Sequence, residues 1–139
     1  GRGLRLACRG RGGVGCVVED CVGGPRAVVF FGCGGGTLRA LGPAEDFKRM
    51  GDGDAGPSTG GMGSYTPLPW APADLGQQVI EQVAQPVVDE MARRGTPFIG
   101  LLYCGLALTS KGMRVVEFNV RFGDPETQAV LARLASSLP

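Results

Sequence analysis

A short polar series near the end of the sequence carries residue types that suit a metal and phosphate site. Glu117, Asn119 and Arg121 alternate with apolar residues, and alternate side chains of a strand share one face. Mg²⁺ takes one or two protein oxygens and completes its shell with phosphate oxygens and water, while a neighbouring guanidinium can hold a phosphoryl or acyl-phosphate oxygen. The alternation fits such a site and a solvated polar strand face equally well. The alternating apolar residues, which we expect to point into the core, are Val116, Phe118 and Val120.

A second segment, residues 48–63, is rich in glycine and small polar residues. Successive small residues let backbone amides turn toward an anion and form a nest, and Lys48 and Arg49 supply positive charge at its start. The spacing matches neither the P-loop nor the dinucleotide fingerprint. It also fails the calcium-loop pattern, because Asp52 and Asp54 are not followed by the required glutamate. A ligand-holding loop and a flexible surface loop both remain open from composition alone.

The composition excludes several kinds of catalytic and binding site. The chain of 139 residues contains no histidine, which excludes histidine bases and Ser-His or Cys-His nucleophiles. A net charge of +1 offers no bulk field for nucleic acid or an anionic membrane, and no apolar run is long enough to span a bilayer. The five cysteines suggest neither a disulfide framework nor a zinc site, so we expect reduced thiols in a cytoplasmic protein.

The first half of the chain predicts short strands. Residues 1–13 lack periodicity and are expected to form an arm without regular structure. Short apolar runs at 16–19, 27–31 and 37–41 predict a meander of antiparallel strands. Residues 42–72 are rich in Gly, Pro, Asp and Ser and predict a long connecting loop.

Residues 74–94 give the clearest helix signal. Asp74 and Gln77 have the spacing of a capping box, and Gly95 is a suitable C-terminal stop. Pro86 is expected to kink the helix or split it in two. The apolar stripe at three- and four-residue spacing, which predicts a core-facing surface, is Leu75, Val79, Ile80, Val83, Val87, Val88 and Met91.

The last third predicts a hairpin and a final helix. The apolar run 99–108 fits a central strand, and residues 110–113 turn it back into a strand over 114–119. Asp124-Pro125-Glu126 resembles an N-cap, a proline at the first helical position and a first-turn acid, so a helix is expected from there to about residue 136. That ending suggests a piece of a longer protein.

Two segments resemble one known family. DFKRMGDGDAGPSTGGMGSYTP, within residues 44–69, is similar to the signature loop of glycinamide ribonucleotide synthetases. GLLYCGLALTSKGMRVVEFNVRFGDPETQAVLARL, within residues 98–134, resembles the end of their ATP-grasp domain. The resemblance covers roughly residues 43–134. The DFKR start and the PLPWAP run look like actinobacterial members.

This resemblance implies a fold and a reaction. We expect an α+β, ATP-grasp-like antiparallel sheet with helices packed on one side, forming an incomplete domain over residues 16–139 after an unassigned arm at 1–15. The implied enzyme joins glycine to 5-phosphoribosylamine with ATP hydrolysis to ADP and phosphate, through glycyl phosphate, in purine biosynthesis. Its implied cofactor is Mg²⁺ or Mn²⁺.

Roles for individual residues also follow from the resemblance. Glu117 and Asn119 would bind the metal that bridges the ATP phosphates. Arg121 would steady the acyl phosphate, and Asp124 would help hold the adjacent loop. The residues implied to border the glycine and phosphoribosylamine site are Lys48, Arg49, Asp52, Asp54, Thr59, Gly60 and Gly61.

The N-terminal part departs from the family pattern. Glu19, Cys21 and Val22 stand where the family has its adenine-binding hinge, and residues 1–15 show no resemblance. Arg26 stands where the family places a glutamate that binds the ribose hydroxyls, and a guanidinium cannot accept their hydrogen bonds.

Two alternatives therefore remain. Besides the ligase that the resemblance implies, the chain could be an inactive remnant of such an enzyme or an ATP-grasp enzyme with another acceptor, such as a carboxylase. Intact Glu117, Asn119 and Arg121 argue against the remnant, whereas Arg26 argues for it. The loop at residues 51–63 resembles the glycinamide family and not the carboxylases.

Overall fold

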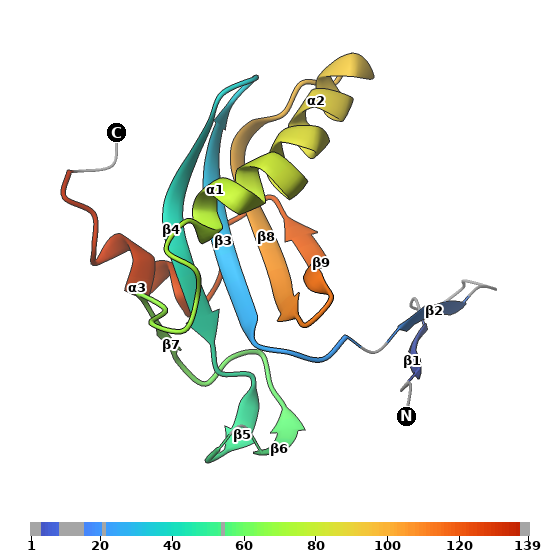
Figure 1. Ribbon diagram of the computed structural model, residues 1–139, viewed down its shortest axis with the longest axis vertical. Coiled ribbons are helices and arrows are strands. Elements are labelled where there is room, and N and C mark those ends of the chain that lie inside the picture. Colours follow the sequence, from blue (N-terminus) through green and yellow to red (C-terminus); the bar gives the residue numbers. More distant parts are fainter. Residues whose placement is uncertain (1–3, 9–15, 21, 54, 137–139) are drawn as a thin grey trace.

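The molecule is built on a five-stranded antiparallel sheet (Figure 1). A computed structural model describes residues 4–8, 16–20, 22–53 and 55–136. The strand order of the sheet is β7-β4-β3-β8-β9. Its strands are β3 (Arg26–Gly34), β4 (Leu38–Asp46), β7 (Ser64–Tyr65), β8 (Ile99–Thr109) and β9 (Gly112–Asn119). The predicted strands in this part of the chain, with β8 inside the sheet and a β8–β9 hairpin, are confirmed.

A long helical segment crosses one face of this sheet (Figure 1). It consists of α1 (Leu75–Val79), a π-helical turn η1 (Ile80–Ala84) and α2 (Gln85–Arg93). The predicted stripe faces the sheet, since each of its residues is buried or half-buried. The π-helical turn η1 ends two residues before Pro86, which lacks the N–H that a continuous α-helix would need. The expected kink or split thus takes the form of a change of helix type, because the segment stays helical from Leu75 to Arg93.

The two ends of this segment differ in how well they were predicted. Gly95 ends the helix with a φ of 78°, and its N–H donates to the Ala92 carbonyl at 2.9 Å. The capping box was wrong, because the Asp74 side chain makes no cap hydrogen bond. Its carboxylate instead accepts a hydrogen bond from the side-chain amide of Gln78, one turn on, at 2.9 Å.

Both faces of the sheet are packed. Alternate residues of β3 serve opposite faces: Val29 and Phe31 pack with the helices, whereas Phe30 packs on the other face with Tyr103 and Val130. Val130 belongs to α3 (Glu126–Leu131). The antiparallel sheet with packed helices is thus confirmed, but the expectation that all helices lie on one side was wrong.

The N-terminal expectations need two corrections. β1 (Leu4–Cys8) is a strand where an arm without regular structure was expected. β2 (Cys16–Asp20) was predicted, but it pairs with β1 and not with β3, so the expected three-stranded meander is wrong. A two-stranded antiparallel hairpin forms in its place, and residues 9–15 lie outside the described residues.

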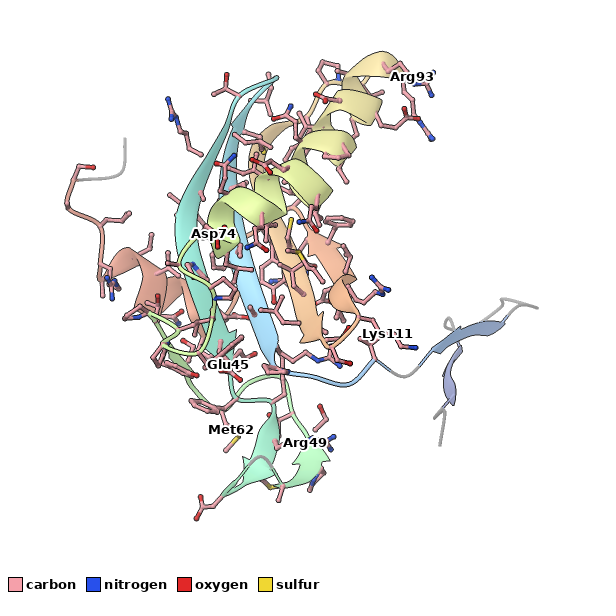
Figure 2. The ribbon with its side chains drawn as sticks, in the orientation of Figure 1. Glu45, Arg49, Met62, Asp74, Arg93 and Lys111 are labelled. Carbon is pink, nitrogen blue, oxygen red and sulfur yellow. The ribbon has the colours of Figure 1, made fainter. Side chains whose placement is uncertain are left out.

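The connection at residues 42–72 is more ordered than a loop. Its first residues extend β4 to Asp46, and β5 (Arg49–Gly51) pairs with β6 (Ala55–Ser58) in a small hairpin. The hairpin lies beyond the end of the sheet, where Figure 2 labels Arg49. The tight turn of this hairpin uses a positive φ of 68° at Gly53. Residues with a side chain rarely adopt that backbone conformation.

The apolar residues of β9 and of the position just after it were expected in the core, and this was wrong. Val116, Phe118 and Val120 are 46%, 43% and 72% exposed. The register shifts here, since Val115 pairs with Leu106 but Glu117 with Gly105, which leaves Val116 as the extra residue of a bulge. β9 also lies at the end of the described sheet, so its side chains lack a neighbour on one side.

The final helix is shorter than predicted. It begins at Glu126, with Pro125 as its N-cap residue, and ends at Leu131 and not near residue 136. Asp124 is not the N-cap; its carboxylate accepts a hydrogen bond from the Gln128 side chain at 2.9 Å. Among the described residues, no helix combines the length and apolar character needed to cross a membrane.

Candidate functional site

Glu117 and Asn119 lie on one face of β9. Glu117 pairs with Gly105 and Asn119 with Tyr103 across the β8–β9 hairpin, and directly opposed residues share a face of the sheet. Glu117 is exposed and Asn119 is half-buried. A Cβ placed on Gly105 would lie 3.0 Å from Cγ of Glu117, so the absent side chain at Gly105 leaves room for the carboxylate.

This pair fits a hard divalent ion that takes few protein ligands. Within the part of the chain that the structure describes, no three His, Cys, Asp or Glu side chains come together as a metal-binding group. Mg²⁺ accepts one or two protein oxygens and leaves the rest of its shell to water and phosphate. A carboxylate and an amide oxygen on one accessible face meet that requirement, and Glu117 and Asn119 would hold the ion.

Arg121 and Asp124 lie beyond the end of β9. Arg121 is exposed, and its Nη1 donates to the Phe122 carbonyl at 2.9 Å. The strand alternation that was expected to align Arg121 with Glu117 stops at Asn119. Asp124 is exposed and its carboxylate holds the first turn of α3 through Gln128.

A buried carboxylate lies between β8 and α3. Glu126 is 1% exposed, and its Oε1 accepts a hydrogen bond from the Tyr103 hydroxyl at 3.0 Å. Burial, the charge of Glu126 and this hydrogen bond raise the pKa of Tyr103, with smaller contributions from Glu117 and Asp46. Sequence reasoning assigned Glu126 only to the first turn of a helix, because its burial depends on packing that no local pattern records.

A second buried carboxylate was missed entirely. Asp46, the last residue of β4, is 7% exposed, and its Oδ2 forms an ion pair with Nζ of Lys48. Burial raises the pKa of the Asp46 carboxyl; the charges of Glu126 and Asp124 act in the same direction, and Lys48 opposes them. The only sequence signal was the position of Asp46 directly before the Phe-Lys-Arg start of the loop.

The two cations at the start of the loop fold back onto it. Nζ of Lys48 donates to the Gly60 carbonyl at 3.2 Å, and Nη1 of Arg49 donates to the Gly56 carbonyl at 2.9 Å. Asp52 is exposed in the turn between β5 and β6, and Asp54 lies outside the described residues. The structure thus brings Lys48 and Gly60 together but does not place Asp54.

Several loop amides are already used inside the loop. The Thr59 N–H donates to the Lys48 carbonyl at 2.6 Å and that of Met62 to the Phe47 carbonyl at 2.7 Å. The Gly61 N–H donates to the Thr59 hydroxyl at 3.2 Å. An anion nest in this segment would therefore have to use other amides.

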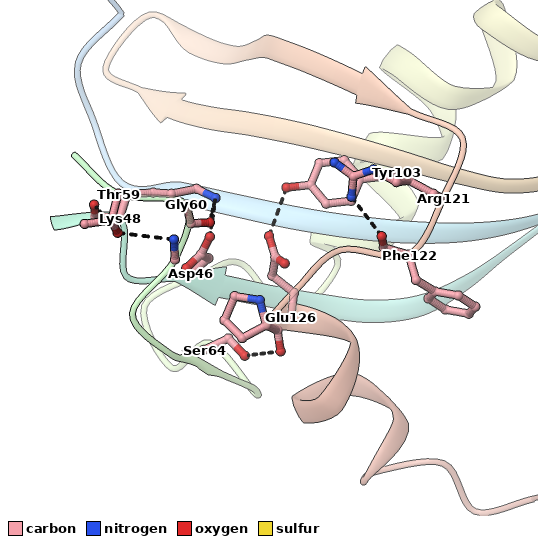
Figure 3. A network of polar contacts seen from close by, with 11 residues as sticks. Asp46, Lys48, Thr59, Gly60, Ser64, Tyr103, Arg121, Phe122 and Glu126 are labelled. Carbon is pink, nitrogen blue, oxygen red and sulfur yellow. Dashed lines mark hydrogen bonds and ion pairs between the residues drawn. The ribbon is translucent and has the colours of Figure 1, made fainter. Parts of the chain in front are cut away.

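The loop and the turn after β9 meet in space (Figure 3). The Ser64 hydroxyl donates to the Pro125 carbonyl at 2.8 Å. A Cβ on Gly61 would lie 2.7 Å from Cδ of Pro125 and 2.9 Å from Oδ1 of Asp46. Residues that are about sixty positions apart in the sequence thereby form one polar cluster on the face of the sheet that carries Glu117 and Asn119.

The predicted adenine hinge is only partly described. Val22 is half-buried, and its carbonyl accepts a hydrogen bond from Nη2 of Arg26 at 3.3 Å. For Glu19 only the backbone of β2 is described, and Cys21 lies outside the described residues. Arg26 begins β3 and is exposed. Its guanidinium therefore occupies the carbonyl of Val22, a residue whose backbone was expected to face the adenine.

An antiparallel sheet with an accessible Glu–Asn pair on its outer strand, and a glycine-rich loop packed against the turn that follows, defines a domain of the ATP-grasp class. The family model of the phosphoribosylglycinamide synthetase ATP-grasp (A) domain matches residues 4–127. The chain belongs to this family.

Individual proteins support the same assignment. The chain is 62% identical over 122 residues to phosphoribosylamine–glycine ligase of Streptomyces coelicolor, covering 88% of this chain and 29% of that protein. The same enzyme of Mycobacterium leprae is 54% identical with the same coverage. These actinobacterial relatives agree with the resemblance of the DFKR and PLPWAP runs.

The fold is also similar to that of a solved structure. The crystal structure of phosphoribosylamine–glycine ligase from Thermotoga maritima matches with a TM-score of 0.75 and 33% identity, over 84% of this chain and 29% of that chain. The chain thus spans less than a third of the length of the relatives that it matches. The family match begins at residue 4, inside the first fifteen residues, for which no resemblance was expected; the division at residue 15 remains a prediction.

Proposed function

We propose that this chain supplies the metal-binding part of a phosphoribosylamine–glycine ligase. The observation that carries the proposal is the shared face of Glu117 and Asn119, with the glycine-rich loop held against the turn that follows β9. The family membership and the names of the relatives favour this reaction over other ATP-grasp reactions.

The reaction has two steps. The γ-phosphoryl group of ATP passes to a carboxylate oxygen of glycine, which gives glycyl phosphate and ADP. The amine of 5-phosphoribosylamine then attacks the acyl carbon, phosphate leaves, the nitrogen loses a proton, and an amide remains. The first step gathers negative charge on the transferred group, and charge of that kind is stabilised by fixed cations and dipoles.

Each site residue has a role in this proposal. Glu117 and Asn119 hold Mg²⁺ or Mn²⁺, which supplies Lewis acidity and a template for the phosphates when bound. Arg121 is exposed two residues after the end of this strand, and its guanidinium steadies the acyl phosphate. Asp124 acts indirectly, by holding the first turn of α3 and so the turn on which the loop packs.

The remaining roles concern the substrates and the nucleotide. The substrate loop, with Lys48, Arg49, Asp52, Asp54, Thr59, Gly60 and Gly61, borders glycine and phosphoribosylamine, and its Lys48 and Arg49 provide positive charge there. Glu19, Cys21 and Val22 face the adenine of ATP. The free thiols of Cys33 and Cys104 and the metabolic substrates favour the cytoplasm as the location.

The inactive remnant remains a second candidate because of Arg26. Its guanidinium is exposed and donates to the Val22 carbonyl, so it offers the ribose hydroxyls no acceptor. A remnant of this kind would keep the fold and the metal face but would bind nucleotide weakly.

A chimeric enzyme tests the proposal. Residues 4–127 of this chain replace the matching segment of a complete relative, and formation of ADP and of glycinamide ribonucleotide is followed with Mg²⁺ and all three substrates. We expect ADP formation to require glycine, and its continuation over many turnovers to require phosphoribosylamine as well. The matched control carries Glu117→Ala and should be inactive. A folded chimera that forms no ADP would support the remnant, and one that accepts a different amine or acyl acceptor would support another ATP-grasp reaction.

A further inference from the structure

Asp46 joins three parts of the molecule that are distant in sequence. It ends β4, it precedes the glycine-rich segment, and its carboxylate lies close to Gly61, which also lies close to Pro125 in the turn after β9. We propose that Asp46 is a positioning residue that fixes the substrate loop relative to the metal-binding strand. This inference rests on the proposed function, which assigns substrate binding to the loop and metal binding to β9.

The base of the loop is closed by backbone hydrogen bonds next to Asp46. The Phe47 N–H donates to the Gly63 carbonyl at 2.9 Å, and the Met62 N–H donates to the Phe47 carbonyl at 2.7 Å. Asp46 itself pairs with Ser64 across β4 and β7. The chain therefore enters and leaves the loop side by side, with the Asp46 carboxylate at this junction.

The carboxylate also determines where the Lys48 ammonium lies. Nζ of Lys48 is held between Oδ2 of Asp46 and the Gly60 carbonyl, so one cation connects the strand end to the far side of the loop. An isolated buried carboxylate is strongly disfavoured, and within the described residues neither oxygen of Asp46 has a partner with hydrogen-bond geometry. The ion pair with Lys48 is thus the contact that compensates the buried charge.

On its other side this junction packs on the turn after β9. A side chain at Gly61 would meet both the Asp46 carboxylate and the Pro125 ring, so Gly61 fits closely between these two groups. The Ser64 hydroxyl adds a hydrogen bond to the Pro125 carbonyl. A side chain at Gly61 would therefore require movement of the turn or of Asp46.

The turn that contains Pro125 is also connected to the strand that carries the proposed metal ligands. Glu126 follows Pro125, and its carboxylate accepts a hydrogen bond from Tyr103, the cross-strand partner of Asn119. A Cβ on Gly123 would overlap with Oε2 of Glu126. Gly123, in the same turn, therefore lies close against the Glu126 carboxylate. A series of neighbouring groups thus leads from Lys48 and Asp46 through Gly61 and Pro125 to Glu126 and Tyr103. Figure 3 shows the Lys48–Asp46 ion pair and the Tyr103–Glu126 hydrogen bond at its two ends.

A purely structural role would not require charge at position 46. Apolar residues of similar volume commonly stabilise a core as well as a buried ion pair does, or better. A buried charge can instead fix one arrangement among several similar ones. The position of Asp46 between the loop and the turn indicates that the fixed arrangement is that of the substrate loop.

Hydrogen exchange on the 139-residue chain tests the positioning directly. In Asp46→Asn the amides of Thr59, Gly61 and Met62 should exchange about tenfold faster or more, while those of β3 and β8 keep their protection, because only the loop junction opens. The matched control is Asp89→Asn, the same change at an exposed position of α2. Ser64→Ala provides a milder second variant and should produce the same local pattern if Asp46→Asn fails to fold. Unchanged exchange in the loop, or an equal loss of protection throughout the sheet, would overturn the proposal.

Kinetics separate this inference from the proposed function. In the chimeric enzyme, Asp46→Asn should raise KM for glycine and phosphoribosylamine by about tenfold and leave KM for ATP within about twofold, since only uniform binding at the loop is lost. Faster loop exchange with unchanged KM values would overturn the substrate role of the loop while the coupling through Asp46 stands. A matching rise in all three KM values would overturn the selective role of Asp46 and leave the ligase proposal intact.

Discussion

The hydroxyl of Tyr103 donates a hydrogen bond to Oε1 of Glu126 at 3.0 Å inside the molecule, linking strand β8 to the first turn of α3. Both residues are buried, and the ring of Tyr103 also packs edge-on against Phe30 at 5.3 Å between ring centroids. This bond satisfies one of the two oxygens of a carboxylate that no other described residue contacts by a hydrogen bond.

Removing this hydroxyl should destabilise the fold. Tyr103→Phe leaves Glu126 buried without a donor, and we expect the free energy of unfolding to fall by about 1–3 kcal/mol. Urea denaturation measures the change. Tyr65→Phe is the matched control, because that hydroxyl also binds a carboxylate, Glu45, but at a half-buried position. An equal decrease in the free energy of unfolding of both variants would contradict the idea that burial makes the loss of the Tyr103 hydroxyl more costly.

Mg·ATP binding should depend on Glu117. We expect Glu117→Ala to weaken it by about 2–3 kcal/mol, the loss of a charged partner. Calorimetry with the native chain and the variant gives the difference. Glu81→Ala, at an exposed position of the helical segment, serves as the control and should bind as the native chain does. Equal affinities of the native chain and Glu117→Ala would remove Glu117 from the metal site.

Nucleotide binding should improve in Arg26→Glu. The substitution replaces a donor by an acceptor for ribose hydroxyls and also releases the Val22 carbonyl, which Arg26 now binds. ATP affinity is measured by calorimetry, with Arg39→Glu, an exposed position on the neighbouring strand β4, as a control for net charge. An affinity that stays the same or falls would mean that Arg26 does not occupy the ribose position.

The stability contributed by Asp46 should decrease as the pH rises. Burial raises the pKa of its carboxyl above the ordinary value of 3.8. Over the interval between the two values the folded chain holds a proton that the unfolded chain has lost, so folding is favoured below 3.8 and this contribution is lost as the pH passes the raised value. The free energy of unfolding of the native chain, minus that of Asp46→Asn, should therefore fall from pH 3.8 toward neutral pH in urea titrations. A difference that rises with pH would show that the pairing with Lys48 outweighs burial.

Residues 1–139 alone should not produce glycinamide ribonucleotide. An acyl phosphate must be protected from water, and positioning accounts for about 7–11 kcal/mol of a two-substrate barrier. A chain that spans 29% of its relatives' length forfeits most of that positioning. The assay supplies all substrates with Mg²⁺ and follows ADP and amide, with a complete relative as positive control. Turnover within about tenfold of that control would show that these residues suffice.

Elements with strong periodicity were predictable from the sequence. The stripe from Leu75 to Met91 identified the helical segment and its buried face, and the run from Ile99 defined a strand inside the sheet. These patterns are local, because burial of one helix face or one strand imposes its own period. The polar face with Glu117 and Asn119 followed from the same rule.

Features that depend on distant contacts were not predictable. The bulge at Val116 and the open position of β9 depend on register and neighbours, and no residue type marks them. The burial of Asp46 and Glu126 depends on a loop and a turn meeting in space, and charged residues are almost never fully buried unless paired. The loop residues were recognised from their resemblance to a family, whereas the charges that hold the loop were not.

The position of β9 has a practical consequence for handling the isolated chain. Its outer edge has no strand beside it in the described sheet, and Val116, Phe118 and Val120 lie at that edge partly open to water. An unpaired apolar edge is a template on which another strand can add. Preparations of residues 1–139 should therefore self-associate as their concentration increases, and a charged residue in place of Val116 should keep them monomeric without touching the polar face of the strand.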